Sequence, residues 1–254
     1  MSGPGNRKTL VTGGARGLGR AVVETLAAAG HDVVFTYNAS AGPAEELATR
    51  LGQAYPGQAF ETLQADLKST DDVARLCSEL EAAGPFYGLV HNAGHTYDTL
   101  AAVMDQARAE EVMAVNYWSL TRLVPALVRP MTRAREGRIV VIGSVVALRG
   151  SVGNAAYAAS KAALLGYVQT LAAETARRGV TVNYVAPGFI DTDMMAPYAE
   201  RRETLQKQIP LGRFATPEDI AGVVGFLLSP QAGYITGATL PVDGGLSSGL
   251  PIQR

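Results

Sequence analysis

The chain has 254 residues and a mass of 26.6 kDa, a length that one doubly wound α/β domain can hold around a single sheet. Its 22 basic and 23 acidic side chains give a net charge of -1, so no overall field attracts nucleic acid or an anionic membrane. Apolar residues make up 47% of the chain and charged residues 18%, which suits a sheet buried on both faces and excludes a disordered protein.

The amino-terminal segment and the cysteine content bear on where the protein works. The segment MSGPGNRKTL lacks a long apolar core behind a basic start, and no run of roughly 18 apolar residues follows it. The single cysteine, Cys77, rules out an internal disulfide bond and fits a reducing compartment. We therefore expect a cytoplasmic protein without a membrane partner.

Short apolar runs alternate with longer helical patterns along the chain. Strands are predicted over residues 8–13, 31–37, 60–66, 87–94, 137–144, 180–188 and 238–245. Helices are predicted over 19–30, 43–55, 71–84, 108–135 and 154–178. Such alternation implies right-handed βαβ units, so we expect one Rossmann-type domain over residues 1–254, a doubly wound parallel sheet with helices on both faces.

The stretch over about 188–216 is less regular than the rest of the chain. It contains Pro197 and Pro210, is followed by Pro217, and carries two mildly amphipathic pieces. Ligands of open α/β sheets bind outside the carboxyl ends of the strands. We expect this stretch to form a helical flap over a substrate site at that edge.

The segment TGGARGLG over residues 12–19 lies directly after the first predicted strand and before the next helix. Glycines at 13, 17 and 19 allow a tight turn and a close approach of the backbone to a diphosphate. The amino terminus of the following helix adds free N–H groups and a positive dipole. In this context the loop predicts dinucleotide binding rather than a merely structural turn.

Three polar side chains are predicted to meet at one strand end. Tyr157 and Lys161 lie four residues apart on a helix, and Ser144 closes the preceding strand. Ketone reduction needs hydride at carbon and a proton at oxygen, and an unperturbed phenol is a weak acid. We expect Lys161 to depress the pKa of Tyr157, and Ser144 to donate a hydrogen bond to the developing alkoxide.

The glycine loop, the Asn92-Ala93-Gly94 triplet and the Ser144, Tyr157 and Lys161 set together resemble the short-chain dehydrogenase/reductase family. The resemblance covers essentially the whole chain. It implies a fourth catalytic position at Asn116, whose main-chain carbonyl would order a water that links Lys161 to solvent. A helix kink without a catalytic role is the alternative for Asn116.

The resemblance also implies where the cofactor binds. Asp66 matches an adenine-side position, although a carboxylate after a strand can simply cap a helix. Pro187 and Gly188 would shape the nicotinamide pocket, although a Pro-Gly pair also ends a strand without any cofactor. The full predicted contact set is Thr12, Gly13, Arg16, Gly17, Leu18, Gly19, Asn38, Asp66, Leu67, Asn92, Ala93, Gly94, Tyr157, Lys161, Pro187, Gly188, Ile190 and Thr192.

The end of the second strand bears on the choice between NADH and NADPH. An acidic side chain there would hydrogen-bond the adenosine ribose and repel a 2′-phosphate, but this strand ends FTYNAS and has no acid. Arg16 in the glycine loop can supply a planar cation for the phosphate, or it can be a solvated loop residue. We predict NADPH as the cofactor and no metal.

Within the family, the chain most resembles 3-oxoacyl-acyl-carrier-protein reductases, through segments such as AAYAASKAALLGY and VNYVAPGFIDTDM. This resemblance implies reduction of a 3-oxoacyl thioester, in fatty acid or in polyketide or polyene biosynthesis. The alternatives are an alcohol, sugar or steroid dehydrogenase and, remotely, a non-catalytic NADP(H) sensor. It also implies an acidic carrier protein docked on Arg135 and Arg178 beside the pocket, although cations near a helix end are favoured by the dipole anyway.

Two histidines depart from the family's usual pattern around the triplet, which reads HNAGHTYD here. His91 and His95 could tune substrate choice or merely fill space, and the sequence favours filling. The family's general assembly is a homotetramer with its long helices packed in pairs. The alanine-rich helix that carries Tyr157 is compatible with such pairing, and equally with packing inside one subunit.

Overall fold

The computed structural model describes residues 7–248. Within that range seven parallel strands form one sheet in the order β3-β2-β1-β4-β5-β6-β7. The strands are β1 Arg7–Thr12, β2 His31–Tyr37, β3 Phe60–Gln64, β4 Gly88–His91, β5 Gly137–Ile142, β6 Val180–Pro187 and β7 Thr239–Val242. The predicted doubly wound parallel sheet is confirmed.

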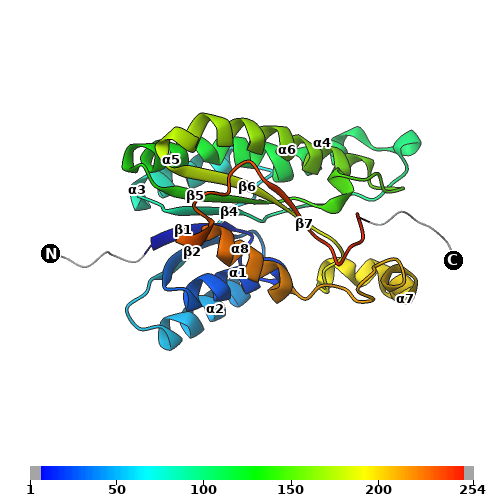
Figure 1. Ribbon diagram of the computed structural model, residues 1–254, viewed down its shortest axis with the longest axis horizontal. Coiled ribbons are helices and arrows are strands. Elements are labelled where there is room, and N and C mark those ends of the chain that lie inside the picture. The colour runs from blue at the N-terminus through cyan, green and yellow to red at the C-terminus, as the bar shows by residue number, and fades with distance from the viewer. Residues whose placement is uncertain (1–6, 249–254) are drawn as a thin grey trace.

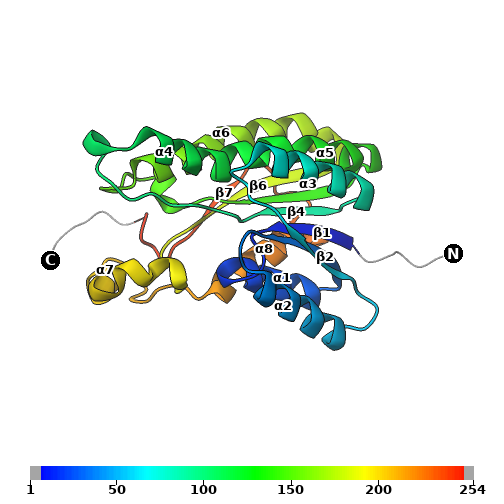
Figure 2. The same ribbon diagram turned by 180° about the vertical axis from the view of Figure 1, so that it is seen from behind.

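Helices cover both faces of the sheet, as Figure 1 and the reverse view in Figure 2 show. They are α1 Gly17–Ala28, α2 Ala41–Ala54, α3 Thr70–Ala83, α4 Gln106–Met113, α5 Ser119–Ala134, α6 Ala155–Thr175, α7 Arg202–Gln206 and α8 Pro217–Leu228. One layer holds α3, α4, α5 and α6, and the other holds α1, α2 and α8. None of the helices in residues 7–248 is long and apolar enough to cross a bilayer.

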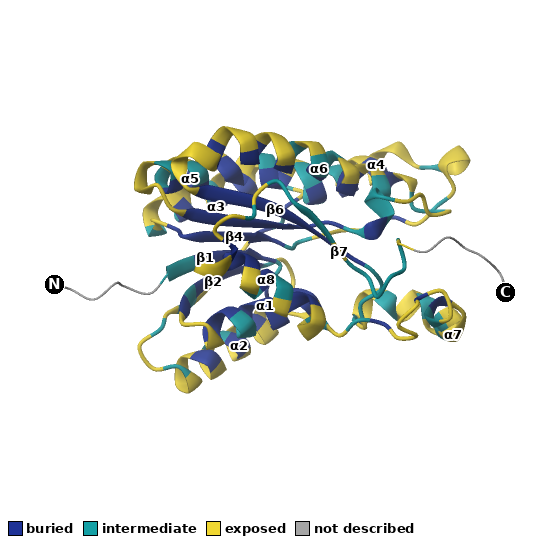
Figure 3. Ribbon diagram, viewed as in Figure 1, coloured by how far each residue is buried: buried dark blue, intermediate teal, exposed yellow. Residues whose placement is uncertain are grey.

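Two apolar clusters lie on the two faces of the sheet. One packs α3, α5 and α6 against the strands, and the other packs α1, α2 and α8. The central strands are buried along their whole length, so they are dark in Figure 3, while the outer sides of the helices are exposed. Burial on both faces explains why these strands read as continuous apolar runs rather than as alternating ones.

The helix predicted over 108–135 is interrupted by one wide turn. Between α4 and α5, residues Ala114–Trp118 form a π-helical turn in which the Ser119 amide bonds to the Ala114 carbonyl. Such turns insert one residue into a helix and are frequent at functional sites. Asn116 lies in the middle of this turn and is fully buried.

Helix α8 has no counterpart among the predicted helices. Its start carries a full capping box, in which the Thr216 hydroxyl accepts from the Asp219 amide and the Asp219 carboxylate accepts from the Thr216 amide, with Pro217 in the first turn. These residues are a recognised helix-start signal. No helix is predicted after residue 216, although Thr216, Pro217 and Asp219 carry this signal.

The site lies at the carboxyl ends of the strands, at the point between β1 and β4 where the strand order reverses. β1 and β4 are neighbours, although β2 and β3 lie between them in sequence, so the chain leaves β1 and β4 toward opposite faces. A crevice opens at such a switch point, outside the carboxyl ends of the strands. At the same edge the 3-10 helix Asp193–Arg201 and α7 lie beside the end of β6, on the right of Figure 1.

Candidate active site

The glycine loop after β1 is shaped by close backbone contacts. The Gly13 amide donates to the Thr36 hydroxyl at 3.1 Å, and the Gly14 amide donates to the Thr36 carbonyl at 2.9 Å. A Cβ atom at Gly19 would lie 1.9 Å from the Gly13 carbonyl oxygen, and Gly17 has a φ of 54°. These positions therefore require glycine, which lets the first turn of α1 fold back over the end of β1.

The residues after β4 hold this loop in place. The Thr12 hydroxyl accepts from the Asn92 and Ala93 amides, each at 3.0 Å. The Asn92 side-chain amide donates to the carbonyls of Thr12 and Gly13, at 3.1 and 3.0 Å. The two strand ends on either side of the switch point are thus joined by four hydrogen bonds.

The amino terminus of α1 meets the requirements of a diphosphate site. No side chain of the described residues caps this terminus, and its first turn carries no acidic residue. Gly17, Leu18 and Gly19 therefore present main-chain N–H groups at the positive end of the helix dipole. The loop fits the diphosphate of a dinucleotide, and the exposed Arg16 lies beside it.

The residues predicted on the adenine side differ in what they can offer. Asp66 accepts from the Lys68 amide at 3.0 Å, so its carboxylate orders the turn before α3, the structural alternative for this residue. Leu67 is 6% exposed and packs into the core, which leaves only its main chain for a ligand. Asn38 is exposed after β2, and its carbonyl accepts from Gln64 at 3.0 Å.

The segment after β6 reaches the glycine loop from the other side. The Gly188 amide donates to the Val242 carbonyl at 3.1 Å, which ties the end of β6, at Pro187, to β7. Ile190 pairs with Ala215. A side chain at Gly17 would meet the Thr192 methyl group at 3.6 Å. The predicted nicotinamide-side residues therefore border the same crevice as the loop.

Ser144, Tyr157 and Lys161 come together at the carboxyl end of β5. Tyr157 and Lys161 lie one turn apart on α6, and the Lys161 ammonium is 5.8 Å from the centre of the Tyr157 ring. The Lys161 Nζ donates to the Ile142 carbonyl at 2.8 Å, two residues before Ser144. A side chain at Gly94 would lie 3.5 Å from Nζ, so the Asn92-Ala93-Gly94 triplet borders the same group.

Burial dominates the titration of this set. It raises the pKa of Tyr157 to about 12, although a hydrogen bond with Ser144 acts in the opposite direction. Burial also lowers the pKa of Lys161 to about 8. The free protein gives no support to the expectation that Lys161 depresses the pKa of Tyr157, because burial sets the direction of the shift and the Lys161 ammonium hydrogen-bonds to the Ile142 carbonyl.

Asn116 faces the same set from the π turn. Its side-chain amide donates to the Ser160 hydroxyl at 2.8 Å and to the His95 carbonyl at 3.0 Å, and its Oδ1 accepts from the His95 amide at 2.7 Å. The Asn116 side chain thus joins the segment after β4 to α6. Its main-chain carbonyl, predicted to order a water, lies 3.0 Å from the Nε2 atom of His91.

Comparison with known proteins agrees with this geometry. A family model described as enoyl-(acyl carrier protein) reductase matches residues 13–247. A short-chain dehydrogenase/reductase from Serratia marcescens has 36% identity and a TM-score of 0.89, over 96% of this chain and 100% of that one. The chain belongs to the short-chain dehydrogenase/reductase family.

Relatives of this short-chain dehydrogenase/reductase carry more specific names. The 3-oxoacyl-acyl-carrier-protein reductases FabG of Pseudomonas aeruginosa and Vibrio cholerae are 45% and 42% identical to it, each over 93% of this chain and 96% of the relative. A blue fluorescent protein from a metagenomic library, solved in complex with NADPH, is 37% identical with a TM-score of 0.88, over 95% of this chain and 98% of that one.

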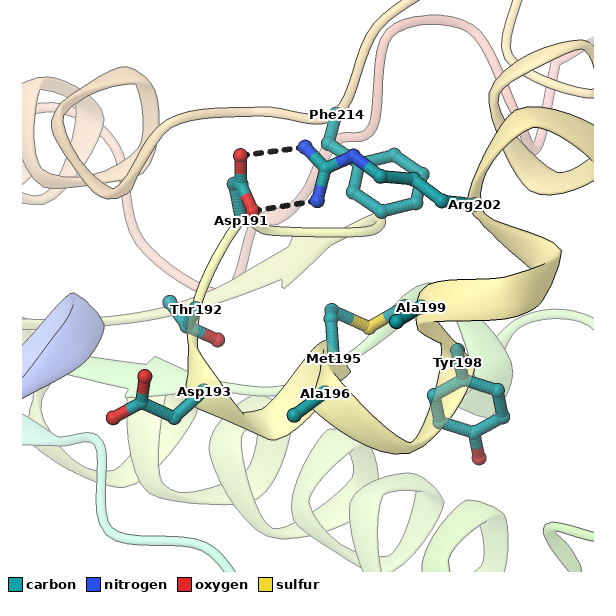
Figure 4. A pocket seen from close by; sticks show the side chains of 9 residues that line it. All are labelled: Asp191, Thr192, Asp193, Met195, Ala196, Tyr198, Ala199, Arg202 and Phe214. Carbon is teal, nitrogen blue, oxygen red and sulfur yellow. Dashed lines mark hydrogen bonds and ion pairs between the residues drawn. The ribbon is translucent and has the colours of Figure 1, made fainter.

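The segment between Asp191 and Phe214 borders the site of this family member. The segment encloses a pocket of about 310 Å³. Figure 4 shows its lining side chains, among which the Arg202 guanidinium binds both oxygens of Asp191, at 2.8 and 2.6 Å. The Tyr198 hydroxyl donates to Asp98, which also accepts from Asn154 at 2.8 Å. The segment therefore touches both the loop after β4 and the start of α6.

Arg135 and Arg178 lie away from this site. Arg135 ends α5, donates to the Arg177 carbonyl at 3.1 Å and immediately precedes β5, while Arg178 immediately precedes β6. A strand rises by about 3.3 Å per residue, so both arginines lie about 20 Å from Ser144, at the amino ends of the strands. The expectation that they flank the pocket is wrong within one subunit.

Tyr184 of β6 is a site residue that the sequence reasoning missed. Its hydroxyl accepts from the Ser144 amide and donates to the Lys161 carbonyl, each at 3.1 Å. Burial raises the pKa of this fully buried phenol, so the hydroxyl keeps the proton that it donates. In the sequence Tyr184 is one aromatic residue in an apolar strand, and no local signal separates it from a core residue.

Replacing Tyr184 by phenylalanine should leave the Ser144 amide and the Lys161 carbonyl without this partner. We expect a loss of about 2 kcal/mol in the free energy of unfolding, measured in urea, and a several-fold lower kcat. Tyr87→Phe is the control, because its buried hydroxyl bonds to the Leu228 carbonyl at 2.8 Å, far from Ser144. It should lose stability but keep kcat, and an unchanged kcat in Tyr184→Phe would contradict a role at the site.

Replacing Lys161 by methionine should stabilise the fold. The pKa of Lys161 is about 8 when folded and 10.5 in its reference state, so below pH 8 the folded protein keeps a charge in a poorly solvated site. We expect Lys161→Met to gain about 3 kcal/mol in unfolding free energy at pH 7, a gain that shrinks as the pH approaches 10. The exposed Lys207→Met should show no such gain. A loss of stability at pH 7 in Lys161→Met would disprove the desolvation argument.

Proposed function

We propose that this protein reduces a 3-oxoacyl thioester to the 3-hydroxyacyl thioester with NADPH. The observation that supports the reaction class is that the partly exposed Ser144 and Tyr157 meet the buried Lys161 at the carboxyl ends of the strands, next to an uncapped helix amino terminus. The substrate class is supported by the identity of over 40% to relatives named 3-oxoacyl-acyl-carrier-protein reductase.

The cofactor would bind along the glycine loop. The main-chain amides of Gly17 to Gly19 would hold its diphosphate, and the residues from Pro187 to Thr192 would border its nicotinamide. When bound, NADPH supplies the hydride that reduces the ketone carbon. Lys161 would hold the nicotinamide ribose hydroxyls from the floor of the crevice.

The protein's own groups supply the proton and hold the substrate oxygen. The Ser144 hydroxyl would donate to the substrate carbonyl and stabilise the negative charge that develops on it. The Tyr157 hydroxyl would transfer its proton to that oxygen and leave a phenolate, which the nearby Lys161 stabilises. Asn116 fixes the helix that carries both residues, and a water on its carbonyl would return a proton through Lys161.

The thioester would arrive on an acyl carrier protein, in fatty acid synthesis or in a polyketide or polyene pathway. For Arg135 and Arg178 to dock that carrier, they must face the pocket of a neighbouring subunit, because within their own subunit they lie at the far edge of the sheet. This condition favours an oligomer, for which we propose a homotetramer. Its environment would be the cytoplasm, where the thiol of Cys77 stays reduced.

A substrate panel tests the proposed reaction. Acetoacetyl thioesters should be reduced with NADPH, and Tyr157→Phe should lower kcat by about 1000-fold or more while NADPH still binds. Simple ketones, alcohols and a 2-enoyl thioester serve as competing substrates. Reduction of the enoyl double bond or of the simple ketones, without turnover of the acetoacetyl thioester, would refute the proposal.

Charge reversal of the two arginines tests the carrier protein separately. Arg135→Glu and Arg178→Glu should raise KM for an acetoacetyl carrier protein by about 10-fold and leave KM for a small acetoacetyl thioester unchanged. The control is Arg129→Glu, an exposed residue of α5. Equal effects on the two substrates would remove docking from the proposal.

The cofactor preference rests on Arg16 and on the lack of an acid after β2. We expect kcat/KM to be at least about 10-fold higher with NADPH than with NADH, and Arg16→Ala to erase most of that difference. Arg20→Ala is the matched control, because Arg20 is exposed and pairs with Glu24 on α1. A preference for NADH in the wild type would overturn the cofactor assignment.

A further inference from the structure

His91 is the last residue of β4, and its side chain is completely buried between the glycine loop and the π turn. Its Nδ1 atom lies 3.3 Å from the Thr12 hydroxyl, and its Nε2 atom lies 3.0 Å from the Asn116 carbonyl. The ring therefore contacts the two segments that flank the switch point. Neither the glycine loop nor the catalytic set accounts for a histidine at this position.

The partners of the ring determine its tautomer. A carbonyl oxygen can only accept, so Nε2 must carry the proton and donate to Asn116. Nδ1 is then an acceptor, and the Thr12 hydroxyl donates to it. Burial, followed by the nearby charge of Lys161, lowers the pKa of His91 to about 3, so the ring is neutral at every physiological pH.

The hydrogen bonds of Thr12 and Asn116 extend this contact in both directions. On one side the Thr12 hydroxyl accepts from the Asn92 and Ala93 amides beside the loop. On the other side the Asn116 side chain donates to the Ser160 hydroxyl at 2.8 Å. Ser160 in turn donates to the main-chain carbonyl of Tyr157 at 2.7 Å. One chain of hydrogen bonds thus runs from the end of β1, through the ring, to the catalytic helix.

We propose that His91 is a positioning residue, which holds the π turn at Asn116 against the glycine loop and so couples cofactor binding to the placement of Tyr157 and Lys161. This proposal rests on the proposed function for its kinetic consequence. The structural consequence, that order in the loop is transmitted to α6, does not depend on the substrate. The buried ring makes two directional hydrogen bonds, whereas an apolar side chain at this position could only pack. A side chain without a donor would leave the Asn116 carbonyl with one hydrogen-bond partner fewer.

A second buried histidine lies at the amino ends of the strands and makes a similar contact. His31 is 5% exposed at the start of β2, and its Nδ1 atom lies 2.9 Å from the Thr9 hydroxyl. It repeats the pairing of a buried histidine with a β1 threonine, away from Ser144 and Asn116. His31→Leu therefore measures what the loss of a buried histidine does to the fold alone.

The experiment compares His91→Leu, His91→Gln, Ser160→Ala and His31→Leu in the full chain. Glutamine places its amide nitrogen about as far from the backbone as Nε2, so it can still donate to the Asn116 carbonyl. We expect His91→Leu to lower kcat for the acetoacetyl thioester by about 10-fold with KM for NADPH within about 3-fold of wild type. His91→Gln should recover most of kcat, and His31→Leu should lose only thermal stability.

Hydrogen exchange provides a readout apart from turnover. In the wild type, NADPH should protect the amides of the glycine loop and also those of residues 155–162. In His91→Leu the loop should still be protected, whereas protection of 155–162 should fall by about 10-fold or more, and His91→Gln should restore it. If the wild type turns over no thioester, the proposed function fails and this comparison alone judges His91.

Three results would overturn the proposal. The first is a kcat of His91→Leu within about 3-fold of wild type together with unchanged amide protection of residues 155–162. The second is a kcat of His91→Gln no higher than that of His91→Leu. The third is a loss of kcat in His31→Leu as large as in His91→Leu. If His91→Leu does not fold, Ser160→Ala decides, because it breaks the next bond of the chain outside the sheet. A lower kcat and weaker protection at an unchanged melting temperature then support the proposal, and unchanged values refute it.

Discussion

The desolvation of Lys161 is the constraint on which the rest of the site depends. A lysine ammonium in bulk water needs no support, but here it is almost fully buried, and burial lowers its pKa to about 8. Such a group persists only where the surroundings supply acceptors in fixed positions, and the Ile142 carbonyl is one of them. The charge of Lys161 therefore lowers the stability of the fold, as expected for a functional group whose role opposes stability.

The carboxyl ends of parallel strands provide the required rigidity. Tyr184 bonds to the main chain at Ser144 and Lys161, so β6 holds the end of β5 and helix α6 together. Asn116 and His91 act from the other side, where they join the loops after β1 and β4 to α6. Most of these hydrogen bonds have a main-chain group as one partner, so a shift of one strand by about an ångström would break several of them at once.

The sheet and the meeting of Ser144, Tyr157 and Lys161 at one strand end could be predicted from the sequence because their signals are local. Seven apolar runs with polar ends mark the strands, and Tyr157 and Lys161 share a helix face by spacing alone. The π turn, the bonds of Tyr184 and the burial of Lys161 depend on contacts between distant segments, so no window of sequence contains them. The expectation that Arg135 and Arg178 flank the pocket of their own subunit was wrong for the same reason: a family pattern supplies residue numbers, but only the fold shows that both residues lie at the amino ends of the strands.

The protonation state of Tyr157 in the free protein shows what the bound state must supply. Burial raises the pKa of this phenol to about 12, so the hydroxyl carries its proton at neutral pH, but the same burial makes it a poorer proton donor. As the proton leaves, the nearby Lys161 comes to stabilise the phenolate, so its contribution is made in the transition state rather than before it. Burial acts on the proton transfer in both directions, so the direction of the reaction is set by the supply of NADPH and not by Tyr157.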